Sequence, residues 1–432
     1  MRVLVTGAYG LIGSACLARL HRDRHALVGA GRSISEARRR FPYARWVAAD
    51  FARLTSAQAW LPLLADIDAV VNCVGVLQDG ARDDTWRVHV EATTALFEAC
   101  ARAGIRRVVH VSAIGAERAG PTRFARSKAE AEARLQELDL DWVILRPALV
   151  LAPAVHGASA MLRGLAGLPW LAPMIGGESR IQIVSIEDVA QTVALALAAG
   201  APAKVRWELA HPQVHTLGEI VAAFRGWLGW PPQRQVRVPR VLEKTVTVAA
   251  DTLGWLGWRS PAHSTAVRQL AAGIVGDPAP WMAATGTTPK RLDEVLAAQG
   301  ASVQDRWFAR LYLIKPFAIG ALALFWLVTG VIALGPGRAA AMAQLGEAGV
   351  RGFPADLILI GGAIFHIALG LLLLVRRAAR GVLITMLAVT LVYVLAGTVL
   401  APQLWIDPLG PLTNIAPLLV ATLFTLAILD ER

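Results

Sequence analysis

Four long stretches without a charged side chain lie near the end of this 432-residue chain, and they leave few folds open. They run over Pro316–Leu334, Leu357–Val375, Gly381–Trp405 and Leu409–Leu429. Each is about long enough to cross a hydrocarbon core of roughly 30 Å as a helix. Helices of a soluble bundle would carry charged faces, and these stretches do not. The pattern predicts an all-α domain of four transmembrane helices over residues 311–432.

Basic residues in the flanks predict how these spans are oriented. The basic side chains before the first span and in the link between the second and third are Arg306, Arg310, Lys315, Arg376, Arg377 and Arg380. The link after the first span holds only Arg338 and Arg351, and the last link holds no Lys or Arg. By the positive-inside rule, both termini are expected in the cytoplasm, with the chain a multi-pass protein of the cytoplasmic (inner) membrane.

One polar residue, His366, interrupts the second stretch. A buried imidazole is costly in lipid unless it finds a partner. It could hydrogen-bond to a neighbouring helix at Thr390, Thr398 or Asn414, or it could contact a quinone or a lipid headgroup. The structural role is the favoured interpretation.

Composition agrees with a membrane protein and argues against two other classes. Hydrophobic residues make up 55% of the chain, which is high for a soluble protein. The net charge of +11 is spread over scattered arginines, so nucleic acid is not expected as a partner. The three cysteines, Cys16, Cys73 and Cys100, have no metal-ligand spacing, so no metal site is expected.

The N-terminal half alternates short apolar runs with amphipathic stretches. The runs are RVLVTG, HALVGAGR, RWVAAD, AVVNCVG, RRVVHVSA and DWVILRPA. In the stretches between them, apolar residues recur at the spacing of a helix. Apolar strands alternating with such helices predict an α/β doubly wound parallel sheet of the Rossmann type, covered on both faces.

The first strand-to-helix turn, VTGAYGLIGSA, predicts a dinucleotide site. Its glycines permit a tight turn, a close approach of the backbone to a pyrophosphate, and close packing of the helix on the sheet. The helix N-terminus adds free N–H groups and a positive dipole end. The expected cofactor-binding residues of this turn are Gly7, Tyr9, Gly10, Leu11, Ile12 and Gly13.

The end of the second strand bears on the choice of cofactor. An acidic residue there would bind the 2′-hydroxyl of NAD, but this chain has Arg32, which suits a 2′-phosphate. NADP(H) is therefore favoured, with NAD(H) as the alternative. At the end of the third strand, Asp50 and Phe51 are expected beside the adenine.

These motifs together resemble the atypical or extended branch of the short-chain dehydrogenase/reductase superfamily, which is NmrA- and epimerase-like. The matching stretches are TGAYGLIG, VVNCVG, VHVSA, ILRPALVLAP and IQIVSIEDVAQTVALAL, and they lie within about residues 1–230. The resemblance implies that Asn72 and Gly75 lie beside the cofactor. It also implies that Ser112 takes the catalytic serine place and that Lys128 binds the nicotinamide ribose.

The chain departs from that family at Phe124, which occupies the tyrosine position in RFARSK. In the family a tyrosine phenol transfers the proton, and a lysine lowers its pKa. The other tyrosines are Tyr9, Tyr43, Tyr312 and Tyr393, and none shares a helix turn with Lys128. The standard alcohol–ketone reaction is therefore not expected. Hydride transfer to a flavin or quinone needs no such tyrosine, and His156 or Glu178 could act as an acid, although surface loop roles are favoured for both.

Residues 231–310 form a connecting segment rich in tryptophan. Tryptophans near basic residues are common at a membrane surface, so part of 240–310 is expected either to rest there or to form a small helical lid. The tryptophans in and around it are Trp227, Trp230, Trp255, Trp258, Trp281 and Trp307.

The C-terminal region resembles the DoxX-like family in size, span count and composition, which implies a loose association with quinone- or thiol-linked redox chemistry. We expect a membrane-anchored NADP(H)-binding oxidoreductase that passes electrons to a membrane-soluble acceptor such as a quinone, with a lipid as another candidate substrate. One alternative is a non-catalytic accessory, assembly or sensing subunit of a membrane complex. The other, an NAD(P)-dependent epimerase or dehydratase, ranks last because of Phe124.

Overall fold

The computed structural model describes residues 1–80, 83–298, 300–347, 349–407 and 410–430. The chain divides into two units. The N-terminal unit comprises Met1–Asp251 and Ser260–Arg306. The helical unit comprises Thr252–Arg259 and Trp307–Arg432.

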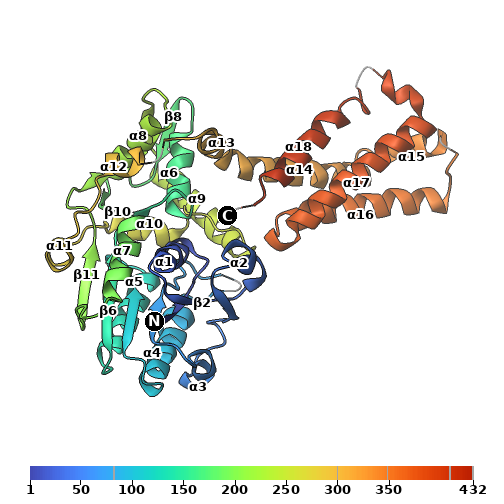
Figure 1. Cartoon of the computed structure of the whole chain (residues 1–432). Coiled ribbons are helices and arrows are strands. Elements are labelled where there is room, and N and C mark those ends of the chain that lie inside the picture. Colours follow the sequence, from blue (N-terminus) through green and yellow to red (C-terminus); the bar gives the residue numbers. More distant parts are fainter. Residues whose placement is uncertain (81–82, 299, 348, 408–409, 431–432) are drawn as a thin grey trace. The chain divides into compact units, whose positions relative to one another are not determined.

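A seven-stranded sheet of order β11-β6-β5-β4-β1-β2-β3 forms the centre of the N-terminal unit (Figure 1). Every pair of neighbouring strands in it is parallel. The strands are β1 (Arg2–Thr6), β2 (Ala26–Gly31), β3 (Arg45–Ala48), β4 (Ala69–Asn72), β5 (Arg107–Val111), β6 (Asp141–Pro147) and β11 (Val205–Leu209). The predicted doubly wound Rossmann sheet is confirmed, and the chain reverses its direction of winding between β1 and β4.

Helices cover both faces of the sheet because alternate strand residues point to opposite sides. Val3 and Val5 pack under α1 (Leu11–Arg22) and α7 (Ile186–Ala196). On the other face, Leu4 packs with α4 (Thr93–Arg102) and α5 (Arg123–Gln136). Further helices of this half are α2 (Ile34–Arg40), α3 (Ala57–Trp60), η1 (Leu61–Leu63) and the π-helix η2 (Arg87–Ala92).

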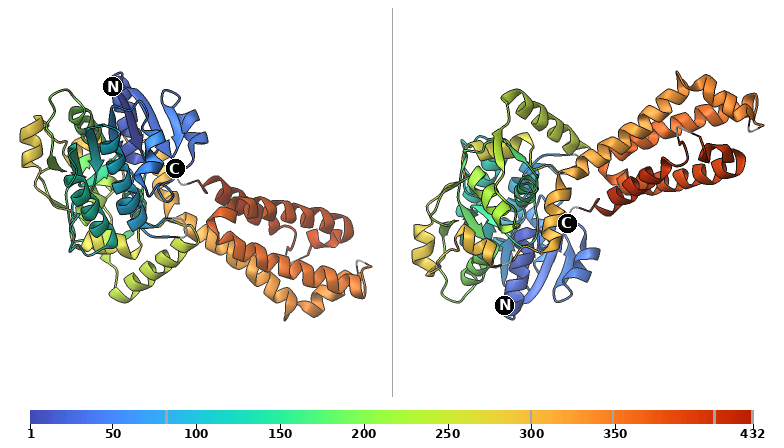
Figure 2. Two further views of the ribbon diagram at one scale, coloured as in Figure 1. Left: turned by 90° about the horizontal axis from the view of Figure 1, so that it is seen from below. Right: turned by 90° about the horizontal axis from the view of Figure 1, so that it is seen from above.

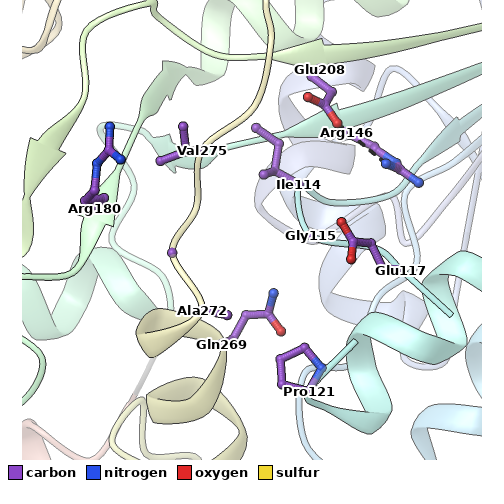
Figure 3. Close-up of a pocket in the computed structure, with 11 residues that line it drawn as sticks. Ile114, Gly115, Glu117, Pro121, Arg146, Arg180, Glu208, Gln269, Ala272 and Val275 are labelled. Carbon is purple, nitrogen blue, oxygen red and sulfur yellow. Dashed lines mark ion pairs between the residues drawn. The ribbon is translucent and has the colours of Figure 1, made fainter. Parts of the chain in front are cut away.

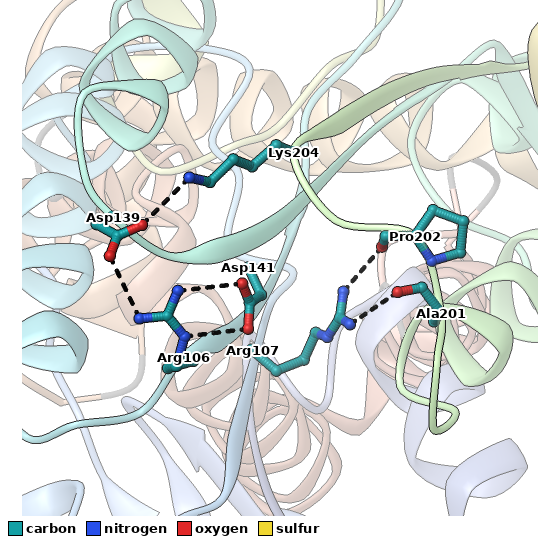
Figure 4. A network of polar contacts seen from close by, with 7 residues as sticks. All are labelled: Arg106, Arg107, Asp139, Asp141, Ala201, Pro202 and Lys204. Atoms are coloured by element: carbon teal, nitrogen blue, oxygen red, sulfur yellow. Dashed lines mark hydrogen bonds and ion pairs between the residues drawn. The ribbon is translucent and has the colours of Figure 1, made fainter.

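Ionic and backbone contacts hold the amino ends of β5 and β6 (Figure 4). Arg106 lies against Asp139 and Asp141, at N–O distances of 3.2 to 3.4 Å. Arg107 donates to the carbonyl oxygens of Ala201 and Pro202 at 3.0 and 2.9 Å. These contacts join β5 to the loop before β11, and because the groups are exposed their stability contribution is small.

The second half of the N-terminal unit is built from short paired strands and helices. The two-stranded pairs are β10-β7, β12-β9 and β13-β8. The strands are β7 (Leu149–Leu151), β8 (Leu171–Met174), β9 (Arg180–Ile181), β10 (Ile183–Ser185), β12 (His215–Thr216) and β13 (Arg234–Arg237). The helices are α6 (Ala158–Ala166), α8 (Leu217–Trp227), α9 (Arg240–Trp255), α10 (Ser264–Ala271), α11 (Ala279–Thr285) and α12 (Leu292–Ala297).

The tryptophan-rich segment divides between the two units. Trp281 is fully buried in the core of the N-terminal unit and donates from Nε1 to Thr192 Oγ1 at 3.1 Å. Trp258 belongs to the helical unit, where its Nε1 donates to the Leu374 carbonyl at 2.6 Å. Trp255 is exposed on α9. The segment is therefore shared between the two units, and its docking on a membrane surface stays a prediction.

Among the residues that the structure describes, three helices of the helical unit are long and apolar enough to cross a membrane. They are α14 (Ile314–Leu334), α16 (Phe353–Leu373) and α17 (Arg376–Leu400). Figure 2 shows these helices in orange to red. Of the fourth predicted span, Leu409–Leu429, Leu409 lies outside the described residues, and the helical part is α18 (Ile415–Ala427), with 13 residues. Such a helix is about 20 Å long, shorter than the hydrocarbon core. The remaining helices are α13 (Val303–Tyr312), α15 (Arg338–Glu347) and η3 (Pro402–Trp405).

Two glycines bring α14 and α16 into close contact. A Cβ added at Gly370 would lie 2.7 Å from the Ala323 carbonyl oxygen, and one added at Gly330 would lie 2.6 Å from that of Ala363. Small residues commonly allow such backbone approach between membrane helices. The two contacts fix the separation of the helices around Trp326 and His366.

We predict that Gly370→Ala lowers the melting temperature of the full chain in detergent, because the added methyl group forces α14 and α16 apart. Gly361→Ala on the same helix is the matched control, since a Cβ there meets nothing within 4 Å. The control is expected to match or exceed the wild type, because alanine is favoured over glycine in a helix interior by about 0.5–1 kcal/mol. Equal melting of the two variants would contradict this packing.

Candidate functional site

The glycine turn after β1 has the geometry that an anion requires. Gly7 has a φ of +62°, and a Cβ there would lie 2.9 Å from the Cys73 carbonyl oxygen. Gly10 is the N-cap of α1 and provides no side-chain cap. The first N–H groups of the helix, at Leu11, Ile12 and Gly13, have no carbonyl partner one turn earlier. The turn therefore presents open backbone donors and a positive helix end, which fit a pyrophosphate.

The expected adenosine end lies at the tips of β2 and β3. Tyr9 Oη accepts from the Arg32 backbone N–H at 3.2 Å, so the tyrosine ring lies across the end of β2. The Arg32 guanidinium pairs with Asp83 at 2.7 Å, a partner that the sequence did not suggest. Asp50 accepts from the Ala52 backbone N–H at 3.2 Å. Phe51 is buried edge-on to Trp60 in the core, so its backbone rather than its ring faces outward.

Asn72 and Gly75 flank the turn after β4. Asn72 is fully buried, accepting from Thr6 Oγ1 at 2.6 Å and lying 3.1 Å from His110 Nδ1. Its amide therefore ties β4 to β1 and β5. Gly75 lies against the lysine of α5, since a Cβ there would be 3.7 Å from Lys128 Nζ.

Lys128 is buried at the carboxyl end of β5. Its ammonium donates to the carbonyl oxygens of Val111 at 2.9 Å and Val74 at 3.3 Å. An ammonium has three donors, so one remains for a ribose hydroxyl. Burial lowers the pKa of Lys128 to about 8, against the smaller opposing effect of Glu132. The structure thus brings Gly75 and Lys128 together beside the glycine turn, and their contact with a cofactor stays a prediction.

Ser112 is not a free hydroxyl, because it donates to the buried carboxylate of Glu132. Glu132 also receives two guanidinium nitrogens of Arg146, with Nη2 at 2.6 Å from Oε2. Arg146 lies 3.5 Å from Glu208 on β11 and donates to the Ala116 carbonyl at 2.8 Å. The Ser112 hydroxyl is therefore hydrogen-bonded to a buried ionic network that links α5, β6 and β11.

Phe124 lies on the first turn of α5 with its ring edge-on to His89, at a centroid distance of 5.6 Å. His89 Nε2 accepts from the Val76 N–H at 2.9 Å, so the proton lies on Nδ1, which donates to Ser127 Oγ at 2.9 Å. Burial, with the charge of Lys128 nearby, holds the pKa of His89 well below its usual range. This histidine is neutral with both nitrogens occupied, so it does not replace the missing phenol.

Neither tyrosine of the N-terminal unit, Tyr9 or Tyr43, supplies a substitute acid at Lys128. Tyr9 covers the end of β2, and the Tyr43 ring stacks on His21 at a centroid distance of 4.2 Å. Tyr312 and Tyr393 belong to the helical unit. The site keeps the residues expected for cofactor binding and has a phenyl ring where the proton donor of the family stands.

A cavity of about 320 Å³ opens beside this network within the N-terminal unit. Figure 3 shows Arg180 on one side and Arg146, Glu117 and Glu208 on the other. Gln269 of α10 lies at its floor and accepts from Thr122, the N-cap of α5, at 2.9 Å. His156 and Glu178 do not line it, and Glu178 is exposed between β8 and β9. Neither predicted alternative acid is therefore placed at the cavity.

Sequence reasoning missed the ionic network, although two signals pointed to it. Glu132 follows Lys128 by four residues, so both lie on one helix face. Arg146 is a charged residue inside the apolar strand DWVILRPA. A charge in a buried strand demands a partner. Within the part of the chain that the structure describes, no cluster of three or more His, Cys, Asp or Glu side chains could hold a metal ion.

Two family models match this chain in separate regions. Residues 3–208 match the NAD dependent epimerase/dehydratase family, and residues 323–423 match the DoxX-like family. The N-terminal region is thus an epimerase-like NAD(P)-binding Rossmann region, and the C-terminal region is DoxX-like. Both resemblances expected from the sequence are confirmed.

Curated relatives include two respiratory proteins and an epimerase. NADH dehydrogenase (ubiquinone) 1 alpha subcomplex subunit 9 of Arabidopsis thaliana is 29% identical over 38% of this chain and 40% of its own length. The NADH-ubiquinone oxidoreductase 40 kDa subunit of Neurospora crassa is 24% identical over 44% of this chain and 49% of its own length. The chain thus spans less than half of each. UDP-glucose 4-epimerase of Mycolicibacterium smegmatis is 29% identical over 59% of this chain and 93% of its own length.

Solved structures share the fold of the N-terminal unit. WbmG of Bordetella bronchiseptica in complex with NAD is similar with a TM-score of 0.51, at 18% identity, over 68% of this chain and 91% of its own. MoeE5 in complex with UDP-glucuronic acid and NAD has a TM-score of 0.52, at 20% identity, over 72% of this chain and 99% of its own. At such identities the likeness shows the fold alone.

We predict that Glu132→Gln destabilises the N-terminal unit by about 3 kcal/mol, because it leaves the buried Arg146 without its main counter-charge. The matched control is Glu130→Gln, two residues earlier on α5, whose carboxylate makes surface pairs with Arg134 and Arg118. Such surface pairs contribute at most about 1 kcal/mol.

Labelling of the buried thiols of Cys16 and Cys100 in the full chain measures opening of this unit. The rate should rise about a hundredfold for Glu132→Gln, since about 1.4 kcal/mol corresponds to a factor of ten. Equal labelling of the two variants would show that the network does not stabilise the fold.

Proposed function

We propose that this protein is a membrane-anchored oxidoreductase that binds NADP(H) and passes electrons to a membrane-soluble acceptor such as a quinone. The observation that supports the proposal is the state of the three catalytic positions. Phe124 cannot donate a proton, Ser112 is bonded to Glu132, and Lys128 is bonded to two carbonyls. The cofactor-binding features remain, whereas the acid–base group for alcohol or ketone chemistry does not.

Different residues would bind different parts of the cofactor. The open N–H groups at the start of α1 would bind the pyrophosphate, and the third donor of Lys128 would bind the nicotinamide ribose. Arg32 would turn from Asp83 to a 2′-phosphate, a stronger anion. The chemistry that bound NADPH would supply is a hydride, which together with one proton from water would reduce a quinone to its hydroquinone. Arg146, Arg180 and Glu117 would position the acceptor headgroup in the cavity.

The proposed location is the cytoplasmic membrane with both termini in the cytoplasm. The basic links before α14 and between α16 and α17 support this orientation. It would place the N-terminal unit where NADPH is present. We also propose that α9 rests on the membrane surface, because its apolar side chains Val241, Leu242 and Trp255 are exposed.

A second function is an accessory, assembly or sensing subunit of a membrane complex, with NADP(H) as a structural ligand. Two curated relatives named as respiratory NADH dehydrogenase subunits support it. The same bonding of Ser112 and Lys128 that argues against alcohol chemistry is compatible with a site that only binds. An epimerase or dehydratase remains third, supported by the mycobacterial relative and opposed by Phe124.

Arg32→Ala should weaken NADPH binding to the full chain by about ten- to a hundredfold and leave NADH affinity nearly unchanged, as expected for a lost charge-assisted hydrogen bond to the 2′-phosphate. Arg39→Ala, an exposed arginine on the following helix, is the control. Calorimetric titration with both dinucleotides measures the effect. An equal loss for both, or none, would remove the case for NADP(H) preference.

Turnover separates the first two functions. In nanodiscs containing the full chain, NADPH oxidation should require added quinone and stop when quinone is omitted. Tight NADPH binding with no oxidation by any quinone analogue would favour the accessory role. Absence of binding by either dinucleotide would refute both.

A further inference from the structure

We infer that the helical unit carries a binding site for the carbonyl headgroup of a lipid-soluble molecule, a quinone by chemical class, formed by Trp326, His366 and Tyr393. The inference builds on the proposed function by giving the membrane-soluble acceptor a site within the bilayer. It concerns binding alone. Hydride transfer requires the reacting atoms to be within about 3–3.5 Å, so that step belongs to the nicotinamide site in the N-terminal unit.

The three side chains come from three different apolar helices, α14, α16 and α17. His366 Nε2 lies 2.7 Å from Tyr393 Oη, which is a strong hydrogen bond. Trp326 packs edge-on against the imidazole at a centroid distance of 4.8 Å. The sequence had suggested Thr390, Thr398 or Asn414 as partners of His366, and the structure places Tyr393 there instead.

The close packing of α14 on α16 fixes this arrangement. Gly330 and Gly370 bring the two backbones together on either side of Trp326 and His366 along the helices. The indole and the imidazole therefore cannot move apart without separating the helices. A preorganised polar group in the hydrocarbon region is expected to have a function.

The cluster has hydrogen-bond donors that the described protein leaves unused. Trp326 is only 3% exposed, and its Nε1–H has no partner among the described residues. If the Tyr393 hydroxyl donates to His366 Nε2, the imidazole proton lies on Nδ1 and is free. If Nε2–H donates instead, the tyrosine O–H is free. Either tautomer leaves one donor at the His366–Tyr393 pair, in addition to the indole N–H.

A purely structural interhelical bond would leave the remaining donors of this cluster without an acceptor, which is unfavourable inside hydrocarbon. An unpaired buried N–H costs about 1–3 kcal/mol, and hydrocarbon offers no water to satisfy it. The partner that the cluster lacks is an acceptor without donors of its own. A quinone ring carries two such carbonyl oxygens, whereas an alcohol or amine headgroup would bring further donors. Phospholipid ester carbonyls share this acceptor chemistry, so the binding measurement is made in a phosphatidylcholine bilayer, where saturable quinone binding distinguishes the two.

The pair is also accessible from the lipid side of the helical unit. Tyr393 is 43% exposed, and the apolar side chains around it on α17, Leu391, Val392 and Leu395, are exposed as well. A molecule dissolved in the bilayer can reach the phenol laterally. A water-soluble ligand has no such path through the apolar surface.

Direct binding of radiolabelled decylubiquinone to the full chain in phosphatidylcholine nanodiscs tests the site. Trp326→Phe removes the indole N–H, and Tyr393→Phe removes the phenol that orients the His366 imidazole. Each variant keeps an aromatic ring and should weaken binding about five- to tenfold, the value of one hydrogen bond. The matched control is Tyr312→Phe, which removes a phenol on α13 outside the three long apolar helices and should bind as the wild type does.

Three results would overturn the site. Wild-type protein could show no saturable quinone binding, or all variants could bind equally. Alternatively, Tyr393→Phe could change the mass of the protein particle, in which case the phenol joins two copies of the chain. Saturable binding that the two variants weaken would uphold the site even if the protein oxidised no NADPH, and that combination would refute only the oxidoreductase function.

Discussion

The buried carboxylate of Glu132 is the interaction on which the arrangement of the site depends. It binds the Ser112 hydroxyl and two nitrogens of Arg146, and Arg146 extends the network to Glu208. Because a buried charge must be paired, these contacts hold α5, β6 and β11 in fixed positions relative to one another. The same contact occupies Ser112, and with Phe124 one helix turn before Lys128 it leaves a site equipped to bind a dinucleotide but not to move a proton to an alcohol.

Under the proposed function, this constraint gives the apolar helices a role. A hydride needs an acceptor. Because Phe124 replaces the phenol, the residues present favour an acceptor whose reduction does not require a positioned phenol. Quinones meet that condition and dissolve in the bilayer that α14, α16 and α17 are long and apolar enough to cross. The cofactor features of one unit and the apolar helices of the other are then parts of a single proposed reaction.

Features set by local pattern could be predicted from the sequence. The alternation of apolar strands and helices predicted the parallel sheet, and the spacing of Gly7, Gly10 and Gly13 predicted the tight turn that opens α1, because both depend on neighbouring residues. Pairs distant in sequence could not be read in this way, such as Arg32 with Asp83 and His366 with Tyr393. The fourth span was predicted from its lack of charge, but its helix has only 13 residues. Pro411 lies four residues before this helix, and Pro417 lies in its first turn.

Hydrogen–deuterium exchange of the full chain with and without NADPH tests the central claim most directly, because it reports both binding and its location. Backbone N–H groups of the glycine turn are open donors that a pyrophosphate would fill. We predict that NADPH slows exchange in peptides covering residues 7–13 and 72–75, with no change in α14 or α16. Unchanged exchange in both of these segments at saturating NADPH would contradict the assignment of this unit as the dinucleotide site.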